Sequence, residues 1–199
     1  YLFKKKGDLL LKIHKYDAAA NLTDSVTINN YSDLFYTPSL QVIRSEDKSK
    51  ILVFHVEKQN EFNALVFDVA TMELMWKKKF EPADVIHGRD FKQMLVDNSG
   101  NMHLILEIDN RKPKLDEHHF KVFEYGPGTM DLTRNYSVNM HEHLTYDVYF
   151  SIDNLNDRLV AGGLYSVENR GRAEGFFYLN VSPKAPFNPT FTFHPFADD

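Results

Sequence analysis

Short apolar runs recur along the chain and are separated by turns rich in Asp, Asn, Ser and Gly. The run that ends at Asp17 is matched by one that ends at Asp68, about fifty positions later, and runs of the same character follow at 119–125 and 175–181. Runs of β-branched and aromatic residues bounded by such turns are typical of antiparallel strands joined by hairpins. The repeat therefore predicts one four-stranded unit used several times.

The strands of each unit differ in how apolar they are. The middle strands, such as 51–54 and 175–179, are apolar on both faces, as expected of a sheet packed between two others. The last strand of each unit alternates instead, as in 26–29, 136–140 and 191–194, which is typical of a strand with one face in solvent. The pattern predicts sheets with a buried centre and a half-exposed outer strand.

Two adjacent glycines, Gly162 and Gly163, interrupt one of the apolar strands. Glycine weakens a strand, and it is typical of a bulge or of a place where another backbone approaches closely. No helical pattern follows the pair, so a phosphate-binding loop is not predicted. We expect a bulge or a close approach at this position.

Four-stranded units at this spacing resemble the blades of the β-propeller superfamily, in which such sheets surround a central channel. The resemblance covers nearly the whole chain, but no WD, kelch or Asp-box motif is present, so it implies a fold without a subfamily. It implies an all-β chain of about three and a half four-stranded antiparallel sheets. Residues 8–32 would form the outer half of one blade, and 36–80, 87–140 and 144–196 would form full blades.

About four blades are needed to close a propeller. We therefore expect residues 1–199 to form one partial β-propeller, a fragment of a larger one. Missing residues or another chain would complete the ring, because an open stack would expose sheet edges and apolar faces.

The composition is that of a folded protein, with 43% hydrophobic and 14% aromatic residues. The formal net charge of -5 lacks the basic character of proteins that bind phosphate backbones, so nucleic acid is not expected as a partner. The absence of cysteine excludes a disulfide framework, a thiolate metal site and a cysteine nucleophile. No apolar run approaches the ~20 residues of a membrane span, and no motif predicts a cofactor.

The location of the protein is not encoded in this stretch of chain. The chain begins at Tyr1 without an initiator Met or a leader, so we expect its true start to have been removed or to lie upstream. The cysteine-free composition, with abundant Asn and Lys, is similar to that of envelope propellers of Bacteroidota. That resemblance implies a secreted, periplasmic or cell-surface location.

Charged residues concentrate in loops that would share one rim of a propeller. In the family that the chain resembles, the loops between blades and the loops between second and third strands lie on the same face, which is the usual site of function. The resemblance implies a non-enzymatic binding or scaffold module that uses this face to bind a protein or a glycan. The candidate binding residues are His87, Arg89, Arg111, Lys112, Lys114, Tyr146, Arg170 and Arg172.

Two chemical functions and a structural one remain as alternatives. Asp90, Glu142 and Asp147 lie near strand entries, where paired carboxylates would serve a glycoside hydrolase or lyase, although Asp is also frequent in turns. His141 and His143 would point the same way on an extended segment and could share a metal ion, although solvated loop histidines are the simpler interpretation. The third alternative is a structural propeller segment completed by another chain.

Overall fold

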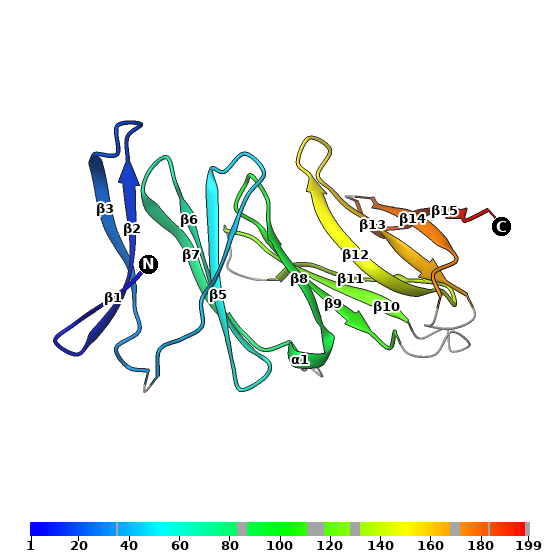
Figure 1. The fold of residues 1–199 in the computed structure, drawn as a ribbon, viewed down its shortest axis with the longest axis horizontal. Helices are drawn as coiled ribbons and strands as arrows, with labels where there is room; N and C mark the ends of the chain where they lie inside the picture. The colour runs from blue at the N-terminus through cyan, green and yellow to red at the C-terminus, as the bar shows by residue number, and fades with distance from the viewer. Residues whose placement is uncertain are drawn as a thin grey trace.

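The computed structural model describes residues 1–34, 36–82, 87–110, 118–127, 132–167, 172–182 and 184–197, with only the backbone of His87, Leu132 and Thr133. Four antiparallel sheets and one helical turn make up this part of the chain (Figure 1). None of its helices has the length and apolar character needed to cross a membrane. The chain is all-β with repeated sheets, as the pattern of apolar runs predicts.

Each sheet is a meander in which every strand pairs with the next one along the chain. The first sheet contains β1 (Leu2–Lys5), β2 (Asp8–Tyr16) and β3 (Leu22–Asn30). The second contains β4 (Gln41–Arg44), β5 (Lys50–Glu57), β6 (Glu61–Asp68) and β7 (Glu73–Phe80). The third follows α1 (His87–Asp90) and contains β8 (Phe91–Val96), β9 (Met102–Ile108), β10 (His119–Tyr125) and β11 (Leu132–Asn139). The fourth contains β12 (Leu144–Asp153), β13 (Arg158–Ser166), β14 (Gly175–Val181) and β15 (Pro189–Pro195).

The first sheet has one strand more than we predicted. β1 pairs with β2, so that Leu2 lies opposite Leu11 and Lys5 lies opposite Asp8. Within β1 only Leu2 is partly buried against the core, and the rest of the strand is exposed. The hydrophobic pattern of residues 2–5 is therefore too weak to predict this strand.

An apolar core lies between each pair of neighbouring sheets. In β5, Leu52 packs in the core shared with the third sheet, whereas Val53 packs in the core shared with the first. In β9, Leu104 packs towards the second sheet and Ile105 towards the fourth. Successive side chains of a strand point to opposite faces, so both faces of these middle strands are buried. This confirms the prediction for 51–54. The prediction for 175–179 is wrong for one face of β14, because Phe177 and Leu179 are buried whereas Phe176 and Tyr178 are about half exposed on the outer side of the last described sheet.

The sheets converge along the edge formed by their first strands, where β8 contacts both β4 and β12. In the turns that follow these strands, Asn154 Nδ2 donates a hydrogen bond to Glu46 Oε2 at 2.8 Å. The backbone N–H of Asn98 in turn donates to Asn154 Oδ1 at 2.8 Å. The second and fourth sheets thus touch, although the third packs between them. Packed sheets lie about 10 Å apart, so the turns of the second and fourth sheets are closer to each other at this edge than two such spacings.

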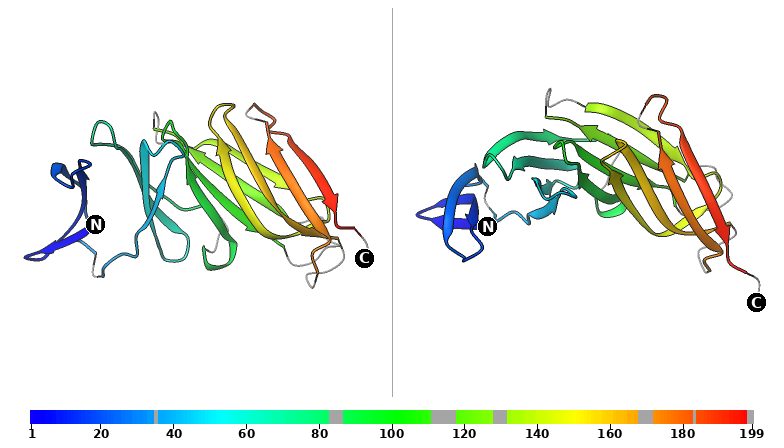
Figure 2. Two further views of the ribbon diagram at one scale, coloured as in Figure 1. Left: turned by 45° about the horizontal axis from the view of Figure 1, so that its top comes forward. Right: turned by 90° about the horizontal axis from the view of Figure 1, so that it is seen from above.

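The row of sheets is curved and open. In the view from above, the sheets follow one another along an arc (Figure 2). The first and fourth sheets lie at opposite ends of that arc. The described strands therefore do not close into a ring.

A bulge in β12 lies opposite the glycine pair of β13. The register shifts between Tyr146 and Tyr149, and Tyr149 pairs with Gly162. A Cβ added to Gly163 would lie 3.0 Å from both Tyr146 O and Val148 Cα. The bulge and the close approach predicted from the two glycines are both confirmed.

Gly163→Ala is expected to destabilise the fold by about 1–3 kcal/mol, because its methyl group would overlap backbone atoms of β12. Gly162→Ala is the matched control, since its Cβ would make an ordinary contact of 3.7 Å with Phe177 O. We expect the control to change the free energy of unfolding by less than about 1 kcal/mol. Chemical denaturation measures both values, and equal losses would contradict the close approach.

Candidate functional site: the loop end

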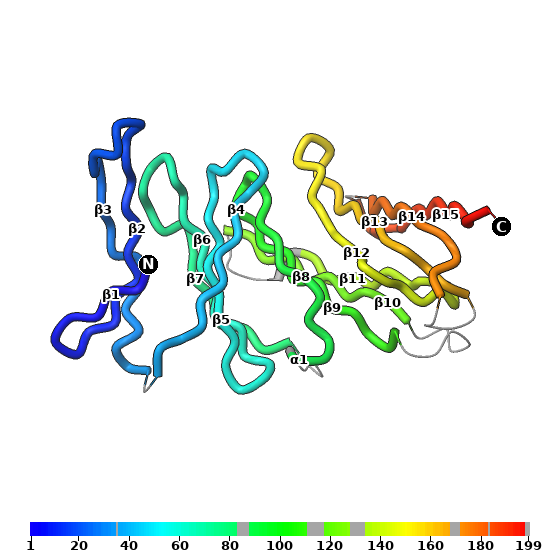
Figure 3. The backbone as a smooth tube through the Cα atoms, viewed as in Figure 1, coloured from blue at the N-terminus to red at the C-terminus, as the bar shows by residue number. Residues whose placement is uncertain are grey.

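The described parts of the linkers between sheets lie at one end of the row, the lower end in Figure 3, together with the turn between β5 and β6. The turn between β2 and β3 lies at the opposite end. Four antiparallel strands return the chain to the end at which it entered the sheet, so every linker emerges there. This end, called the loop end below, includes residues 31–34 and 36–40, the turn between β5 and β6, α1 and the turn between β11 and β12.

Arg89 and Asp90 of α1 form a bidentate ion pair at the loop end. Arg89 Nε donates to Asp90 Oδ1 at 2.6 Å, and Nη2 donates to Oδ2 at 2.8 Å. Asp90 is buried, and its hydrogen bonds and negative charge raise the pKa of the Arg89 guanidinium. The carboxylate of Asp90 is therefore held as an acceptor for Arg89.

Glu142 and Asp147, the other two candidate carboxylates, lie on different elements and are exposed. Glu142 is in the turn between β11 and β12 with φ at 67°, and Asp147 is in the bulge of β12 with φ at 46°. Positive φ is a turn and bulge conformation that Asp tolerates better than most residues. The positive φ of the bulge thus accounts for an Asp at position 147 without a catalytic role.

His141 and His143 lie in a turn, and the expectation of an extended segment is wrong. The φ of His141 is 48°, and the ring of His143 stacks on Phe193 with their centroids 4.3 Å apart. His143 Nδ1 also lies 2.8 Å from the backbone O of His141. Within the described ranges no three His, Asp or Glu side chains are grouped so that they could hold a metal ion.

The remaining candidate binding residues lie apart from one another or outside the described residues. Tyr146 is half-buried in β12, and Arg172 is exposed just before β14. The backbone of His87 begins α1. The candidates outside the described residues are Arg111, Lys112, Lys114 and Arg170.

A buried hydrogen-bond network connects the third and fourth sheets at the loop end. Glu107 Oε1 accepts hydrogen bonds from Thr145 Oγ1 at 2.9 Å and from Asn110 Nδ2 at 2.7 Å. Asn110 Nδ2 also donates to the backbone O of Thr145 at 2.8 Å. The backbone N–H of Thr145 donates to Asn110 Oδ1 at 3.1 Å. His118 Nδ1 donates to the backbone O of His143 at 2.7 Å. Burial raises the pKa of Glu107, but hydrogen bonds from His118 and Thr145 help to lower it overall.

The turn between β5 and β6 is anchored by a buried carboxylate. The side chain of Glu61 is only 2% exposed, and Lys79 Nζ lies 2.6 Å from its Oε1. Lys58 Nζ donates to Oε2 at 3.3 Å. These contacts, with Lys79 the largest, lower the pKa of Glu61 to about 2.

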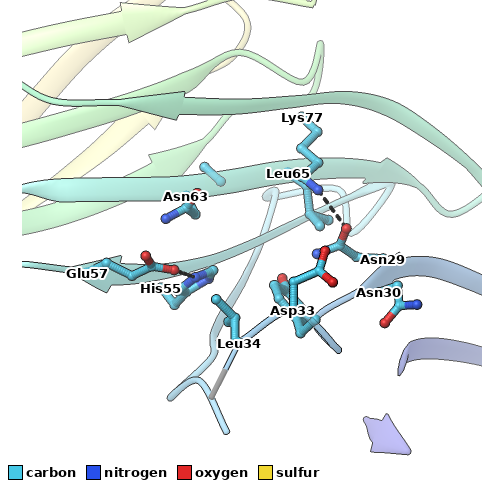
Figure 4. A pocket seen from close by; sticks show the side chains of 11 residues that line it. Asn29, Asn30, Asp33, Leu34, His55, Glu57, Asn63, Leu65 and Lys77 are labelled. Carbon is cyan, nitrogen blue, oxygen red and sulfur yellow. Dashed lines mark hydrogen bonds and ion pairs between the residues drawn. The ribbon is translucent and has the colours of Figure 1, made fainter. Parts of the chain in front are cut away.

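A pocket of about 180 Å³ lies between the first and second sheets at the loop end (Figure 4). The end of β3 and the linker after it form one wall, and β5, β6 and β7 form the other. The sequence pattern did not predict this pocket. The polar residues His55 and Asn63, which interrupt the apolar runs of β5 and β6, could have indicated it. Its polar lining includes Asn29, Asp33, His55, Glu57, Asn63 and Lys77.

Two buried polar atoms of this pocket lack hydrogen-bond partners among the described residues. They are Nδ1 of His55 and Nδ2 of Asn63. The side chain of His55 is 5% exposed, and its Nε2 donates to Glu57 Oε1 at 2.9 Å. A buried polar group without a partner costs about 1–3 kcal/mol, so such groups call for an explanation such as a water molecule or a ligand.

No family model matches the chain. No curated protein is significantly similar to it in sequence. The function is therefore inferred from the fold and from the geometry of the loop end.

Glu61→Gln is expected to destabilise the protein at neutral pH and to have little effect near pH 2. The ordinary pKa of this carboxyl is 4.5, and the folded state lowers it to about 2. Its contribution to stability is therefore fully present above pH 4.5 and is lost as the pH falls towards 2. The difference in free energy of unfolding between wild type and variant, measured by urea denaturation, should shrink over that range.

The exposed residue Glu73 provides the control for this measurement, as Glu73→Gln. The control variant should follow the wild type at every pH. A constant difference between wild type and Glu61→Gln from pH 7 down to the acid limit would contradict the role of the Glu61 charge.

Proposed function

We propose that the chain forms consecutive blades of a β-propeller. The support for this is the convergence of three sheets at their first strands, together with face-to-face packing of every neighbouring pair. In a straight stack, the second and fourth sheets would be separated by the full thickness of the third along their whole width. The hydrogen bond between Glu46 and Asn154 fits a radial arrangement.

The propeller serves as a non-enzymatic binding module, and its partner is a glycan that docks at the loop end. The observation that carries this proposal is the polar pocket at that end, lined by amide and carboxylate side chains. Amides and carboxylates pair well with the hydroxyl groups of sugars, since a hydroxyl both donates and accepts hydrogen bonds. The proposal needs no catalytic pair, in keeping with the ion pair in which Asp90 is already held.

A cross-linking experiment tests the radial arrangement. The chain has no cysteine, so Glu46→Cys with Asn154→Cys gives a single reactive pair at the converging edge. Glu73→Cys with Thr190→Cys gives a matched exposed pair on the outer strands β7 and β15. We expect a short bismaleimide to link the first pair within one molecule and to leave the second unlinked, as read by peptide mass spectrometry. Failure of both pairs would indicate a straight stack.

A glycan array tests the binding proposal. Asp33→Asn with Lys77→Ser alters one anion and one cation of the pocket lining at the loop end, both exposed. Asp24→Asn with Lys15→Ser makes the same change at the opposite end. We expect the first variant to bind its glycans about tenfold more weakly, the effect of losing one charged hydrogen bond of about 1.5 kcal/mol. The second variant should bind as the wild type does.

Two results on the array would contradict the proposal. Weaker binding by the variant with changes at 15 and 24, without an effect of the changes at 33 and 77, would place the partner at the opposite end. A wild-type chain that binds no glycan would remove the glycan as partner.

A further inference from the structure

We infer that the pocket between the first and second sheets is a subsite for one neutral sugar ring, in which a single hydroxyl group bridges His55 and Asn63. The inference rests on the proposed glycan-binding function and adds to it the site and the ligand class. It is carried by two buried polar atoms, Nδ1 of His55 and Nδ2 of Asn63, that have no partner among the described residues.

The two groups lie next to each other on one face of the second sheet. His55 in β5 and Asn63 in β6 are directly opposite in the strand register. Opposite residues of antiparallel strands have Cβ atoms about 4.5–5.5 Å apart, which lets one small group contact both side chains. Figure 4 shows them on the same wall of the pocket, across from Asp33.

The hydrogen bond to Glu57 determines what His55 offers to a ligand. An ionised carboxylate only accepts hydrogen bonds, so Nε2 of His55 carries the proton that points to Glu57 Oε1. In the neutral ring, Nδ1 is then an acceptor. Nδ2 of Asn63 is a donor. One acceptor beside one donor matches a hydroxyl group, which donates to His55 and accepts from Asn63.

Polar residues at this position are unexpected for a face that otherwise belongs to the core. Further along the same face of the second sheet, Val53, Leu65 and Phe67 pack against the first sheet. Apolar side chains at 55 and 63 would continue that core without leaving polar atoms unsatisfied. A bound hydroxyl group supplies the missing partners.

The rest of the pocket favours a neutral ring of limited size. The described lining of the pocket contains two carboxylates, Asp33 and Glu57, and a single lysine, Lys77. The Lys77 ammonium already donates a hydrogen bond to Asn29 Oδ1 at 2.7 Å. Phosphorylated or acidic sugars would be repelled by this balance. The pocket volume of about 180 Å³ is below the ~300–1,000 Å³ of sites for larger ligands, so one ring enters and the rest of a glycan remains outside.

The test compares the wild type with a double variant that carries both His55→Phe and Asn63→Leu. Glucose, galactose, mannose and N-acetylglucosamine are titrated individually into the ¹⁵N-labelled chain of residues 1–199. For the wild type we expect at least one of the four sugars to shift the side-chain amide resonance of Asn63. Backbone amide resonances of β5 and β6 report binding in both chains, and the double variant should bind that sugar at least tenfold more weakly. Its thermal midpoint should stay close to that of the wild type, because the two unsatisfied atoms are removed together with the hydrogen bond from His55 to Glu57.

Asn180→Leu is the matched control, since Asn180 Oδ1 is another buried atom without a partner among the described residues but lies in the fourth sheet. This variant should bind the sugar as the wild type does. If the double variant keeps full affinity, or if none of the four sugars shifts Asn63 while the wild type binds glycans on the array, the pocket holds only water and the inference is overturned. In that case the proposed function still stands, whereas an array without any bound glycan would remove both.

Discussion

Burial of both faces of the middle strands β5 and β9 is the constraint on which this structure depends. Leu52 and Val53 are successive residues of β5, yet they pack in different cores on opposite sides of the sheet. Such a sheet cannot be stable alone, because one of its apolar faces would always be exposed to water. Neighbouring sheets must therefore stack, and the meander of four strands then places every linker at one end. The position of the loop end is a consequence of how the core is buried.

Hydrophobic contact has no direction, so directed hydrogen bonds orient the sheets. The amide of Gln93 in β8 donates to the backbone O of Phe150 in β12 and accepts from its N–H, both at 2.9 Å. A side chain thereby imitates strand pairing between the first strands of two sheets. On the other side of the third sheet, the buried Trp76 Nε1 donates to Gly100 O at 2.8 Å. These bonds, with the contact between Glu46 and Asn154, hold the sheets as a fan.

The fold was predictable from the sequence where side-chain periodicity carries the information. The repeated strands, the burial of both faces of β5 and the bulge opposite Gly163 all follow from local patterns, whereas β1 has too few buried residues to produce such a pattern. The candidate site was harder to predict, because it depends on contacts between residues far apart in sequence. Nothing in the sequence pairs His55 with Asn63 before the register of β5 and β6 is known. The turn at His141 likewise depends on positive φ values that no motif indicates.

The three interfaces between sheets differ mainly at the loop end, and this difference supports the functional proposal. Between the second and third sheets, aromatic rings fill the space, with Phe62 and Phe91 centroids 6.2 Å apart. Between the third and fourth, the space holds a network centred on Glu107, whose polar groups find partners within the chain. Between the first and second sheets lies a pocket in which His55 Nδ1 and Asn63 Nδ2 have no hydrogen-bond partner among the described residues. A purely structural module would gain stability by closing this third interface as it closes the other two, so the open one is where a ligand is expected.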